Sequence, residues 1–372
     1  MRNVLFVTYH YLHGSGGGTN ATRGYINAFS ALSEKITLLC PVQEGLAPEK
    51  IDPKVTVIPV ADNAPKWKKF LHLLCGRLHR YMKVFGKVLS SESFDTVVFD
   101  TCYSSFRLVK AARQAGARVI TIHHNFQLQF VKDNYRFPLL QPLRFWTKRA
   151  ERDALLLSDV NFVLTEDDKR QLQRYYDPGE QAVVKVFGVN EYAHAEVIPA
   201  PARVDMPVFI ITGNLQMPQT EIPLMEWVER YYPILREEVP DADVIVAGRN
   251  PSDALTQKCL DAGMEIIPSP ANMQTVLVLG RYYICPTDMG SGLKLRSMDG
   301  LKNGMPVLSH QAAARGYEPL IGKSVFVYHD APSFRVALKA MMASPLQREE
   351  ICAMYRDVFS LEAGIDRLRS LL

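Results

Sequence analysis

Short apolar runs alternate along the first half of the chain with longer stretches in which apolar residues recur every three or four positions. The short runs are rich in β-branched and aromatic residues and predict buried strands, whereas the longer stretches predict helices that pack on them. The expected strands are NVLFVTYHY, KITLLCP, KVTVIPV, FDTVVFDT, ARVITIHHN and DVNFVLTEDD. Strands that alternate with helices indicate βαβ units and a parallel sheet.

Helix boundaries in this half are predicted from residues that favour helix ends. Thr19 or Asn20 is expected to cap the helix that follows the first strand. Gly116 is expected to end the helix FRLVKAARQAG, and a further helix is expected to begin at Thr165.

The pattern stops between Val189 and Pro207, where three prolines interrupt a stretch without clear periodicity, and then restarts at Val208. The second series of predicted strands is VFIITGN, ADVIVAGRNP, MEIIPS, RYYICPT, MPVLSH and SVFVYH. The predicted fold is therefore α/β, with two Rossmann-like doubly wound parallel-sheet domains. The predicted segments are domain 1–190, linker 191–206, domain 207–355 and a terminal helix 356–372 that can cross back to the first domain.

Ligands of such sheets bind where the strands end at their carboxyl edge, so the expected site is a cleft between the two domains. A length of 372 residues, with 47% hydrophobic and 22% charged residues, fits two globular domains. The net charge of +4 is too small to indicate nucleic-acid binding.

The six cysteines include no Cys-x-x-Cys pair, which indicates free thiols in a reducing compartment and no zinc site of that type. The chain passes directly from Met1 into a predicted strand, so no leader is expected. No apolar run reaches the roughly 18 residues that a membrane-spanning helix needs. We therefore expect a cytoplasmic protein.

A glycine-rich segment, HGSGGGTNATRG, follows the first predicted strand. Gly16, Gly18 and Ala21 fit the dinucleotide-binding fingerprint, but the next strand ends in Leu-Cys-Pro and lacks the acid that would hold a ribose. A classical NAD site is therefore disfavoured. Gly16, Gly17 and Gly18 instead predict a loop that a ligand can approach closely, with a simple flexible turn as the alternative.

Two histidines, His123 and His124, end another predicted strand. Because side chains alternate along a strand, one of them is expected to face the cleft while the other packs in the core. Structural histidines remain the alternative. No cysteine or clear carboxylate partner is expected nearby, so we do not predict a metal site there.

A basic amphipathic stretch extends from Lys66 to Val88, with seven lysine and arginine residues and no acidic residue. One helix or two short ones are expected. The stretch is typical either of a helix with a solvated basic face or of a surface that is attracted to an anionic membrane or a lipid-phosphate substrate.

The segment DMGSGLKLRSMDGLKNGMPVLSH places a glycine turn between a predicted strand and a helix that ends at Gly304. Free N–H groups at a helix start suit phosphate, and Lys294, expected in the first helical turn, adds a positive charge. Asp299 can accept hydrogen bonds from sugar hydroxyl groups. Together these features suggest a nucleotide-diphosphate ligand.

These C-terminal motifs resemble the GT-B-fold glycosyltransferases of family 4, in particular a retaining, metal-independent subgroup whose donor loop reads Gly-Ser-Gly-x-Lys. The resemblance rests on GSGLKLRSMDGLKNGMPVLS, on the segment from TGNLQMP to VIVAGRNPS and on VFGVNEY. The first domain matches only in layout, through its glycine loop and TIHHN.

The resemblance implies catalytic roles for His123, near the transferred sugar, and for Lys294, at the leaving diphosphate. It implies that Gly16, Gly17, Gly18 and Arg23 form a loop near the diphosphate and acceptor. The implied donor-binding residues are Gly213, Asn214, Arg249, Ser269, Gly290, Ser291, Gly292, Leu293 and Asp299.

Three of these positions depart from the typical family pattern. Ser291 and Asp299 stand where the two acids of the family's Glu–seven residues–Glu motif fall, and Asn214 replaces a typical arginine. Lys294 and Arg249 are expected to supply the positive charge instead.

The implied activity is retaining transfer from a nucleotide-diphosphate sugar to a glycan or lipid-linked acceptor, in surface polysaccharide assembly. No cofactor, metal or nucleic acid is expected, and the basic stretch predicts a peripheral position at the inner face of the membrane. Two alternatives stay open: a catalytically silent subunit that binds nucleotide or glycan, and a nucleotide-sugar epimerase of the same fold. The shortage of paired carboxylates in the strand-end loops disfavours the epimerase.

Overall fold

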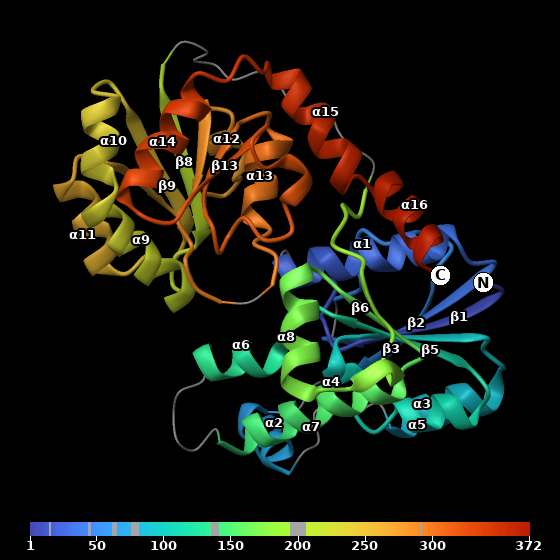
Figure 1. Cartoon of the computed structure of the whole chain (residues 1–372). Helices are drawn as coiled ribbons and strands as arrows, with labels where there is room; N and C mark the ends of the chain where they lie inside the picture. Colours follow the sequence, from blue (N-terminus) through green and yellow to red (C-terminus); the bar gives the residue numbers. More distant parts are fainter. Residues whose placement is uncertain are drawn as a thin grey trace. The chain divides into compact units, whose positions relative to one another are not determined.

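The computed structural model describes residues 1–14, 16–43, 46–61, 65–75, 82–134, 141–193, 206–290 and 292–372. The chain divides into two compact units (Figure 1). The first unit contains Met1–Ala195 together with Phe359–Leu372, and the second contains Glu196–Val358. Each unit is built on one parallel sheet, which confirms the predicted fold class.

The N-terminal unit has a seven-stranded sheet in the order β3-β2-β1-β4-β5-β6-β7. Its strands are β1 (Asn3–Thr8), β2 (Lys35–Val42), β3 (Thr56–Ala61), β4 (Thr96–Asp100), β5 (Arg118–His123), β6 (Val160–Val163) and β7 (Val184–Val186). All neighbouring strands pair in parallel. The strand order reverses direction between β1 and β4, where ligand sites of doubly wound sheets commonly lie.

Continuous apolar runs form these strands because both faces of the sheet are covered. In β1, every residue from Val4 to Thr8 is buried, and so is every residue of β4. Such strands do not alternate between polar and apolar residues. Phe85, Phe99 and Leu108 belong to a buried cluster that packs one part of the sheet against its helices.

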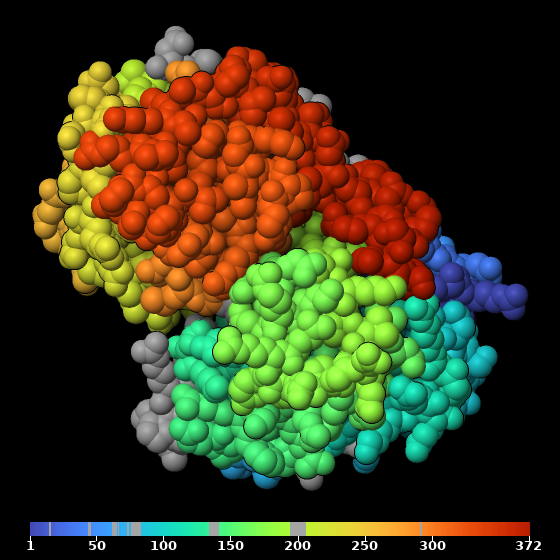
Figure 2. Space-filling view, in the orientation of Figure 1, coloured from blue at the N-terminus to red at the C-terminus, as the bar shows by residue number. Residues whose placement is uncertain are grey.

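The helices of this unit are α1 (Gly17–Ala31), α2 (Lys66–Leu74), α3 (Met82–Ser91), α4 (Cys102–Ser105), α5 (Val109–Gln114), α6 (Gln127–Asn134), α7 (Gln141–Leu157), α8 (Glu166–Tyr176) and α16 (Leu361–Leu371), with a short 3₁₀ turn η2 (Gly179–Gln181). The space-filling view shows green atoms, from the part of the chain that holds α7 and α8, over much of the visible face of this unit (Figure 2). No helix among the residues described has both the length and the apolar composition needed to cross a membrane.

Two helix predictions for this unit fare differently. The helix expected at Thr165 is confirmed, because the Thr165 side chain caps α8 by accepting a hydrogen bond from the Asp168 backbone N–H at 3.0 Å. The cap expected at Thr19 or Asn20 is wrong, because α1 begins at Gly17 with Gly16 as its N-cap and has no side-chain cap. The basic stretch forms α2 and α3, and its residues 76–81 lie outside the described part of the chain.

The last helix, α16, packs against α1 within the N-terminal unit (Figure 1). Asn190 fills the space that two glycines leave open: a Cβ atom on Gly24 would lie 2.3 Å from the Asn190 carbonyl oxygen, and one on Gly364 would lie 2.3 Å from its Cγ. Arg367 on α16 donates hydrogen bonds to the carbonyl groups of Phe187 (2.6 Å) and Val189 (2.8 Å). The C-terminal residues thus fasten the segment that follows β7.

The second unit has a six-stranded sheet in the order β10-β9-β8-β11-β12-β13. Its strands are β8 (Val208–Asn214), β9 (Asp243–Arg249), β10 (Glu265–Pro268), β11 (Tyr282–Cys285), β12 (Val307–His310) and β13 (Val325–Tyr328). Its helices are α9 (Pro218–Arg230), α10 (Tyr232–Glu238), α11 (Asp253–Asp261), α12 (Gln274–Leu277), α13 (Arg296–Lys302), α14 (Ala331–Met342) and α15 (Arg348–Phe359), with a 3₁₀ turn η3 (Glu318–Leu320).

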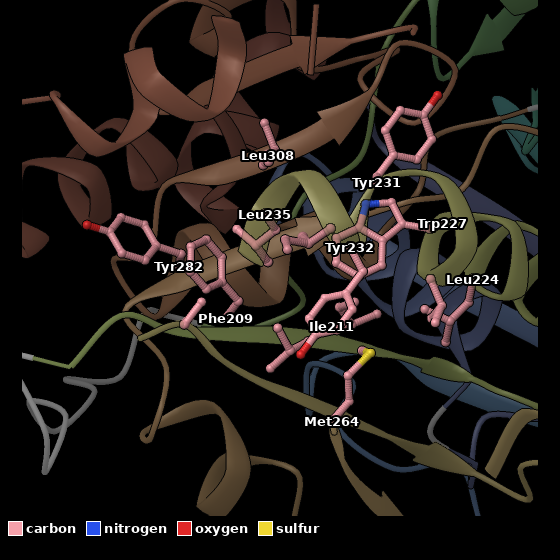
Figure 3. Close-up of a cluster of buried hydrophobic side chains, with 14 of the residues drawn as sticks. Phe209, Ile211, Leu224, Trp227, Tyr231, Tyr232, Leu235, Met264, Tyr282 and Leu308 are labelled. Carbon is pink, nitrogen blue, oxygen red and sulfur yellow. The ribbon is translucent and has the colours of Figure 1, made fainter. Parts of the chain in front are cut away.

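Several large aromatic side chains lie in the core of the second unit (Figure 3). The rings of Phe209 on β8 and Tyr282 on β11 stack with centroids 4.9 Å apart. On the helical layer, Trp227 and Phe334 meet edge to face at 6.3 Å. Large rings of this kind bury much apolar area and hold their neighbours in fixed positions. In this core, ring contacts pack β8 against β11 and α9 against α14.

Candidate functional site

A glycine turn follows β11 in the second unit. Gly290 (φ +83°) and Gly292 (φ +75°) adopt the left-handed backbone conformation that favours glycine. A Cβ atom on Gly290 would lie 3.0 Å from Lys294 Nζ and 3.2 Å from Gln219 Oε1. The Lys294 ammonium group therefore lies against the bare backbone of Gly290. Ser291 lies outside the described residues.

The helix after this turn begins later than expected. Helix α13 starts at Arg296 with Leu295 as its N-cap, so Lys294 precedes the helix and does not lie in its first turn. The expectation that Lys294 lies in the first helical turn is therefore wrong. Lys294 is only 9% exposed, and its carbonyl oxygen accepts a hydrogen bond of 2.8 Å from the buried Tyr317 hydroxyl.

Arg296 brings a second positive charge to the carboxyl end of β8. Its Nη2 donates a hydrogen bond of 2.9 Å to Thr220 Oγ1, and its Nη1 lies 3.0 Å from where a Cβ atom on Gly213 would be. Sequence reasoning assigned the charge in this region to Lys294 and Arg249 and missed Arg296. The sequence did contain a signal for Arg296, because it is a second basic residue two positions after Lys294.

Helix α9 connects these two positions. Gln219 in its first turn lies near Gly290, and the next residue, Thr220, holds Arg296. The start of one helix thus lies beside both bare glycine positions, Gly290 and Gly213. The carboxyl ends of β8 and β11 and the start of α13 are therefore brought to one place.

The ends of β8 and β9 approach each other very closely. Gly213 pairs in register with Gly248, where an added Cβ atom would lie 2.0 Å from the Gly213 carbonyl oxygen. Asn214 pairs with Arg249, and both residues are exposed at the strand ends. The structure thus places these two predicted donor residues side by side at the carboxyl edge of the sheet.

Ser269, after β10, lies at the same edge. Its φ of +48° is unusual for a residue that is not glycine. Its backbone N–H donates a 2.7 Å hydrogen bond to the Gly248 carbonyl, and its Oγ accepts one of 3.1 Å from the Asn250 N–H. The loop that carries this implied donor-binding residue is therefore tied to the end of β9.

Two further predicted donor-binding residues, Leu293 and Asp299, follow the glycine turn and lie before and within α13. The Leu293 side chain is buried beside Lys294. Asp299 lies in the first turn of α13 and is half-buried. Burial chiefly raises the pKa of the Tyr283 hydroxyl, and the nearby Asp299 carboxylate raises it further. Asp299 therefore brings its negative charge close to the end of β11.

In the N-terminal unit, the glycine segment and Arg23 belong to α1. Gly17 and Gly18 lie in the first turn of the helix, and a Cβ atom on Gly18 would lie 3.0 Å from Cε1 of His10. Arg23 is only 1% exposed. Its guanidinium group donates hydrogen bonds to the carbonyl groups of Glu49 (2.9 Å) and Leu12 (2.6 Å). Arg23 therefore ties two loops together beneath the surface.

His123, at the end of β5, is buried and hydrogen-bonded. Its Nε2 lies 3.0 Å from Oδ1 of Asn161 on β6. Its Nδ1 is buried and has no hydrogen-bond partner among the described residues. Burial lowers the pKa of His123 to about 4, although the hydrogen bond to Asn161 opposes this effect. The ring is therefore neutral near pH 7.

His124 has the carboxylate partner that sequence reasoning did not find. Its Nε2 lies 2.5 Å from Oδ1 of Asp100, a fully buried residue at the end of β4. The other carboxylate oxygen of Asp100 accepts hydrogen bonds from the hydroxyl groups of Thr8 (2.6 Å) and Thr22 (2.8 Å). The expectation that no clear carboxylate lies near the histidine pair is therefore wrong.

Asp100 is stabilised in its charged form despite its burial. Burial alone would raise its pKa, but the charge and hydrogen bond of His124, the charge of His10 and the Thr8 hydroxyl outweigh that effect and hold the pKa at about 2. The His10 ring stacks on His124 with centroids 5.4 Å apart. Three groups that can bind a metal thus meet where β1, β4 and β5 end.

A second buried acid, Glu151 on α7, supports the segment that follows His124. Its carboxylate accepts hydrogen bonds from the backbone N–H groups of Gln127 (2.6 Å) and Leu128 (3.3 Å) at the start of α6, and from the Tyr176 hydroxyl (2.8 Å). Burial raises the pKa of Glu151 to about 7, although these hydrogen bonds oppose the rise.

The fold resembles solved glycosyltransferase structures over nearly the whole chain. Sucrose-phosphate synthase from Thermosynechococcus elongatus has a TM-score of 0.73 at 13% identity and covers 100% of this chain and 98% of its own. The lipopolysaccharide outer core galactosyltransferase WaaB has a TM-score of 0.64 at 13% identity over 100% of both chains. Anabaena HepE, solved with UDP and glucose, has a TM-score of 0.63 at 12% identity over 99% and 98%. These likenesses support the GT-B fold.

A curated relative encoded in a cps region of Klebsiella pneumoniae, described as an uncharacterized 44.6 kDa protein, is 25% identical over 134 residues. The match spans about a third of that relative's length, 34% of each chain. Residues 15–190 match the model of Glycosyltransferase Family 4. This match lies in the N-terminal half, where the sequence suggested likeness only in layout. This match covers just under half of the chain and supports the predicted resemblance to glycosyltransferase family 4.

Proposed function

We propose that this protein is a retaining glycosyltransferase of family 4 that moves a sugar from a nucleotide-diphosphate donor to a glycan or lipid-linked acceptor in surface polysaccharide assembly. One observation carries the proposal: Lys294 lies against bare Gly290, and Arg296 lies against bare Gly213. Glycine lets a phosphate group approach the backbone closely, and two neighbouring cations suit the charge of a diphosphate.

Lys294 and Arg296 are both proposed to stabilise the leaving diphosphate. In the proposed reaction, the bond between the sugar C1 and the phosphate oxygen breaks while the acceptor oxygen bonds to C1 on the same face. The acceptor proton passes to the departing phosphate oxygen. Lys294 and Arg296 stabilise the negative charge that develops on the diphosphate, and because they are fixed in place they need little reorganisation. We propose that no metal is needed at the donor.

The choice of donor and pathway rests on relatives. Anabaena HepE has been solved with UDP-glucose, and a trehalose-6-phosphate protein of E. coli with UDP-2-fluoro glucose, which supports a UDP-sugar as the first donor to test. The cps-region relative supports a polysaccharide pathway.

An exposed apolar surface on α2 supports a lipid-linked acceptor or a membrane-bound position. Trp67 is 64% exposed, and Phe70 and Leu71 are exposed beside it. Lys68 and Lys69 lie on the same short helix. Basic helices that also expose aromatic and leucine side chains bind anionic membrane surfaces.

The proposed function is tested by measuring UDP binding and UDP-glucose turnover in Lys294→Ala, with Lys323→Ala as the control. Lys323 is an exposed lysine of the same unit. Loss of one charged hydrogen bond to the diphosphate should weaken UDP binding about 10- to 100-fold and slow turnover. The control should behave as wild type. Undiminished binding and turnover in Lys294→Ala would contradict the proposal, whereas binding without any transfer in wild type would support the silent-subunit alternative.

A further inference from the structure

Three side chains with metal-binding groups meet in the N-terminal unit. His10 follows β1, Asp100 ends β4, and His124 follows β5. These strands are neighbours in the sheet. One ligand atom from each residue lies within 4.8 Å of the other two. The cluster therefore arises from the strand order and could not be found from sequence spacing.

The composition of the cluster suits a transition metal. Imidazole nitrogen and carboxylate oxygen are the usual ligands of Zn²⁺ and of related divalent ions. Two histidines and one carboxylate also leave at least one coordination position open for water or another oxygen ligand. Zn²⁺ sites of this composition are typically open sites of that kind.

The surroundings of Asp100 match those of a metal-binding carboxylate. Thr8 and Thr22 donate to Oδ2, which leaves Oδ1 for the histidine side of the cluster. Ligating carboxylates are commonly held by such outer hydrogen bonds, which orient them and maintain their charge. Asp100 is fully buried, so its orientation is well determined by these partners.

His10 supplies an independent observation. Its Nε2 is buried and has no hydrogen-bond partner among the described residues. A buried polar atom without a partner is unfavourable, and in native proteins such atoms usually have a function or an unseen partner. Tyr9 stacks on the His10 ring at 4.4 Å, and Gly18 leaves room for the ring on another side. The ring is thus held in place while one of its nitrogens is unused.

We propose that His10, Asp100 and His124 bind one divalent transition-metal ion of the Zn²⁺ class. Metal–ligand distances of about 2.0–2.2 Å require ligand atoms to be roughly 3 Å or more apart, so the hydrogen bond between His124 and Asp100 opens when the ion binds. The proton that His124 Nε2 shares with Asp100 is displaced when the ion binds, and the neutral imidazole then carries its proton on Nδ1. This proposal does not rest on the proposed glycosyl transfer.

The test uses the full-length protein after removal of metal by a chelator. Zn²⁺ is titrated by calorimetry, and Co²⁺ is titrated with visible absorption, which reports coordination by nitrogen and oxygen ligands. We expect one ion per chain and a higher melting temperature with metal. The central variant is His10→Phe, because phenylalanine preserves the aromatic stack with Tyr9 but cannot bind the ion. Site-specific binding should be lost or weakened at least about tenfold.

The matched control is His329→Ala. His329 and Asp330 form another histidine–aspartate pair, with Nε2 and Oδ2 3.5 Å apart, but both residues are exposed. Metal binding should be unchanged in this variant. His124→Phe is a second test, and circular dichroism reports whether each variant is folded. UDP binding is measured in parallel, so a failure of the metal site is distinguished from a failure of the donor site.

Two results would overturn the proposal. One is wild-type protein that takes up neither Zn²⁺ nor Co²⁺ in a saturable manner. The other is binding that persists at full strength in folded His10→Phe, which would mean that the ion binds adventitiously elsewhere on the surface.

Discussion

At the scale of single residues, the second unit places two cationic side chains beside glycine residues. Gly213 and Gly290 have no side chain, and Arg296 and Lys294 occupy the space beside them. The sequence identified Lys294 because it lies two residues after the Gly-Ser-Gly turn. It did not identify Arg296, because the contact with Gly213 joins residues far apart in the chain and depends on Thr220 to direct the guanidinium group.

The first prediction concerns Arg296→Met, which keeps a long side chain but removes the charge. UDP affinity should fall about 10- to 100-fold, since a charged hydrogen-bonding partner of the diphosphate is lost. Calorimetric titration with UDP measures the effect. Thr220→Val serves as the graded control, because it frees Arg296 without removing its charge, and should weaken UDP binding less. Equal affinities in wild type and Arg296→Met would show that Arg296 does not contact the ligand.

At the scale of elements, strands were predicted well and helix starts less well. Buried parallel strands give continuous apolar runs that periodicity detects directly. Helix starts are usually read from a capping side chain, but α1 begins after Gly16, which has none. Similarly, α13 begins at Arg296, because Gly290 and Gly292 extend the preceding turn. In both cases the helix follows a glycine turn, so no capping side chain marks the helix start in the sequence.

The first N–H groups of helix α6 donate hydrogen bonds to the buried carboxyl group of Glu151 on α7. The raised pKa of this group predicts that the stability of the protein depends on pH. The pKa of Glu151 is raised from 4.5 to about 7 in the folded protein, so the folded state holds the proton more tightly than the unfolded state. The stability contributed by this group is therefore complete below pH 4.5 and is lost as pH rises to about 7. The change is on the order of 3 kcal/mol.

Glu151→Gln should remove this dependence. The difference in unfolding free energy between variant and wild type should shift in favour of the variant as pH rises from 4.5 to 7.5. Urea unfolding at several pH values measures it, with the exposed Glu180→Gln as the control. A difference that stays constant over this range would mean that Glu151 has an ordinary pKa.

Helix α2 is predicted to bind anionic membranes through its exposed aromatic face. Trp67→Ser should weaken sedimentation with vesicles that contain anionic lipid by about 10- to 100-fold, because a large apolar side chain no longer enters the interface. Added salt should weaken binding further. Val336→Ser is the control, since Val336 is an equally exposed apolar residue on α14. Equal loss in both variants would indicate nonspecific adhesion.

At the scale of the whole molecule, the sequence predicted two parallel-sheet units but not which strands are neighbours. The alternation of strands and helices is local, whereas the order β3-β2-β1-β4-β5 depends on tertiary packing. For this reason the sequence showed His124 but not its partner: Asp100 lies 24 residues earlier along the chain, on the adjacent strand.

A substitution in α16 should report on the N-terminal unit. In Gly364→Val, the new Cβ atom would meet Asn190 at 2.3 Å, and the contact between α16 and α1 would have to open. Overpacking of this kind costs about 1–3 kcal/mol. Hydrogen exchange should show faster exchange in α1 and β1 but unchanged exchange in β8 and β11. Gly86→Ala, where the space around Cβ is open, is the control. Uniform protection across both units would contradict this assignment of α16.

The return of α16 to the first unit also has a consequence for synthesis of the protein. Because the first unit needs both Met1–Ala195 and Phe359–Leu372, the second unit is an insertion within it. The ribosome releases the whole second unit before the last residues that complete the first, and domains generally fold as units while the chain emerges. The half of the protein that is made first therefore completes its folding last, and until then the surface of α1 that receives α16 stays open to chaperones.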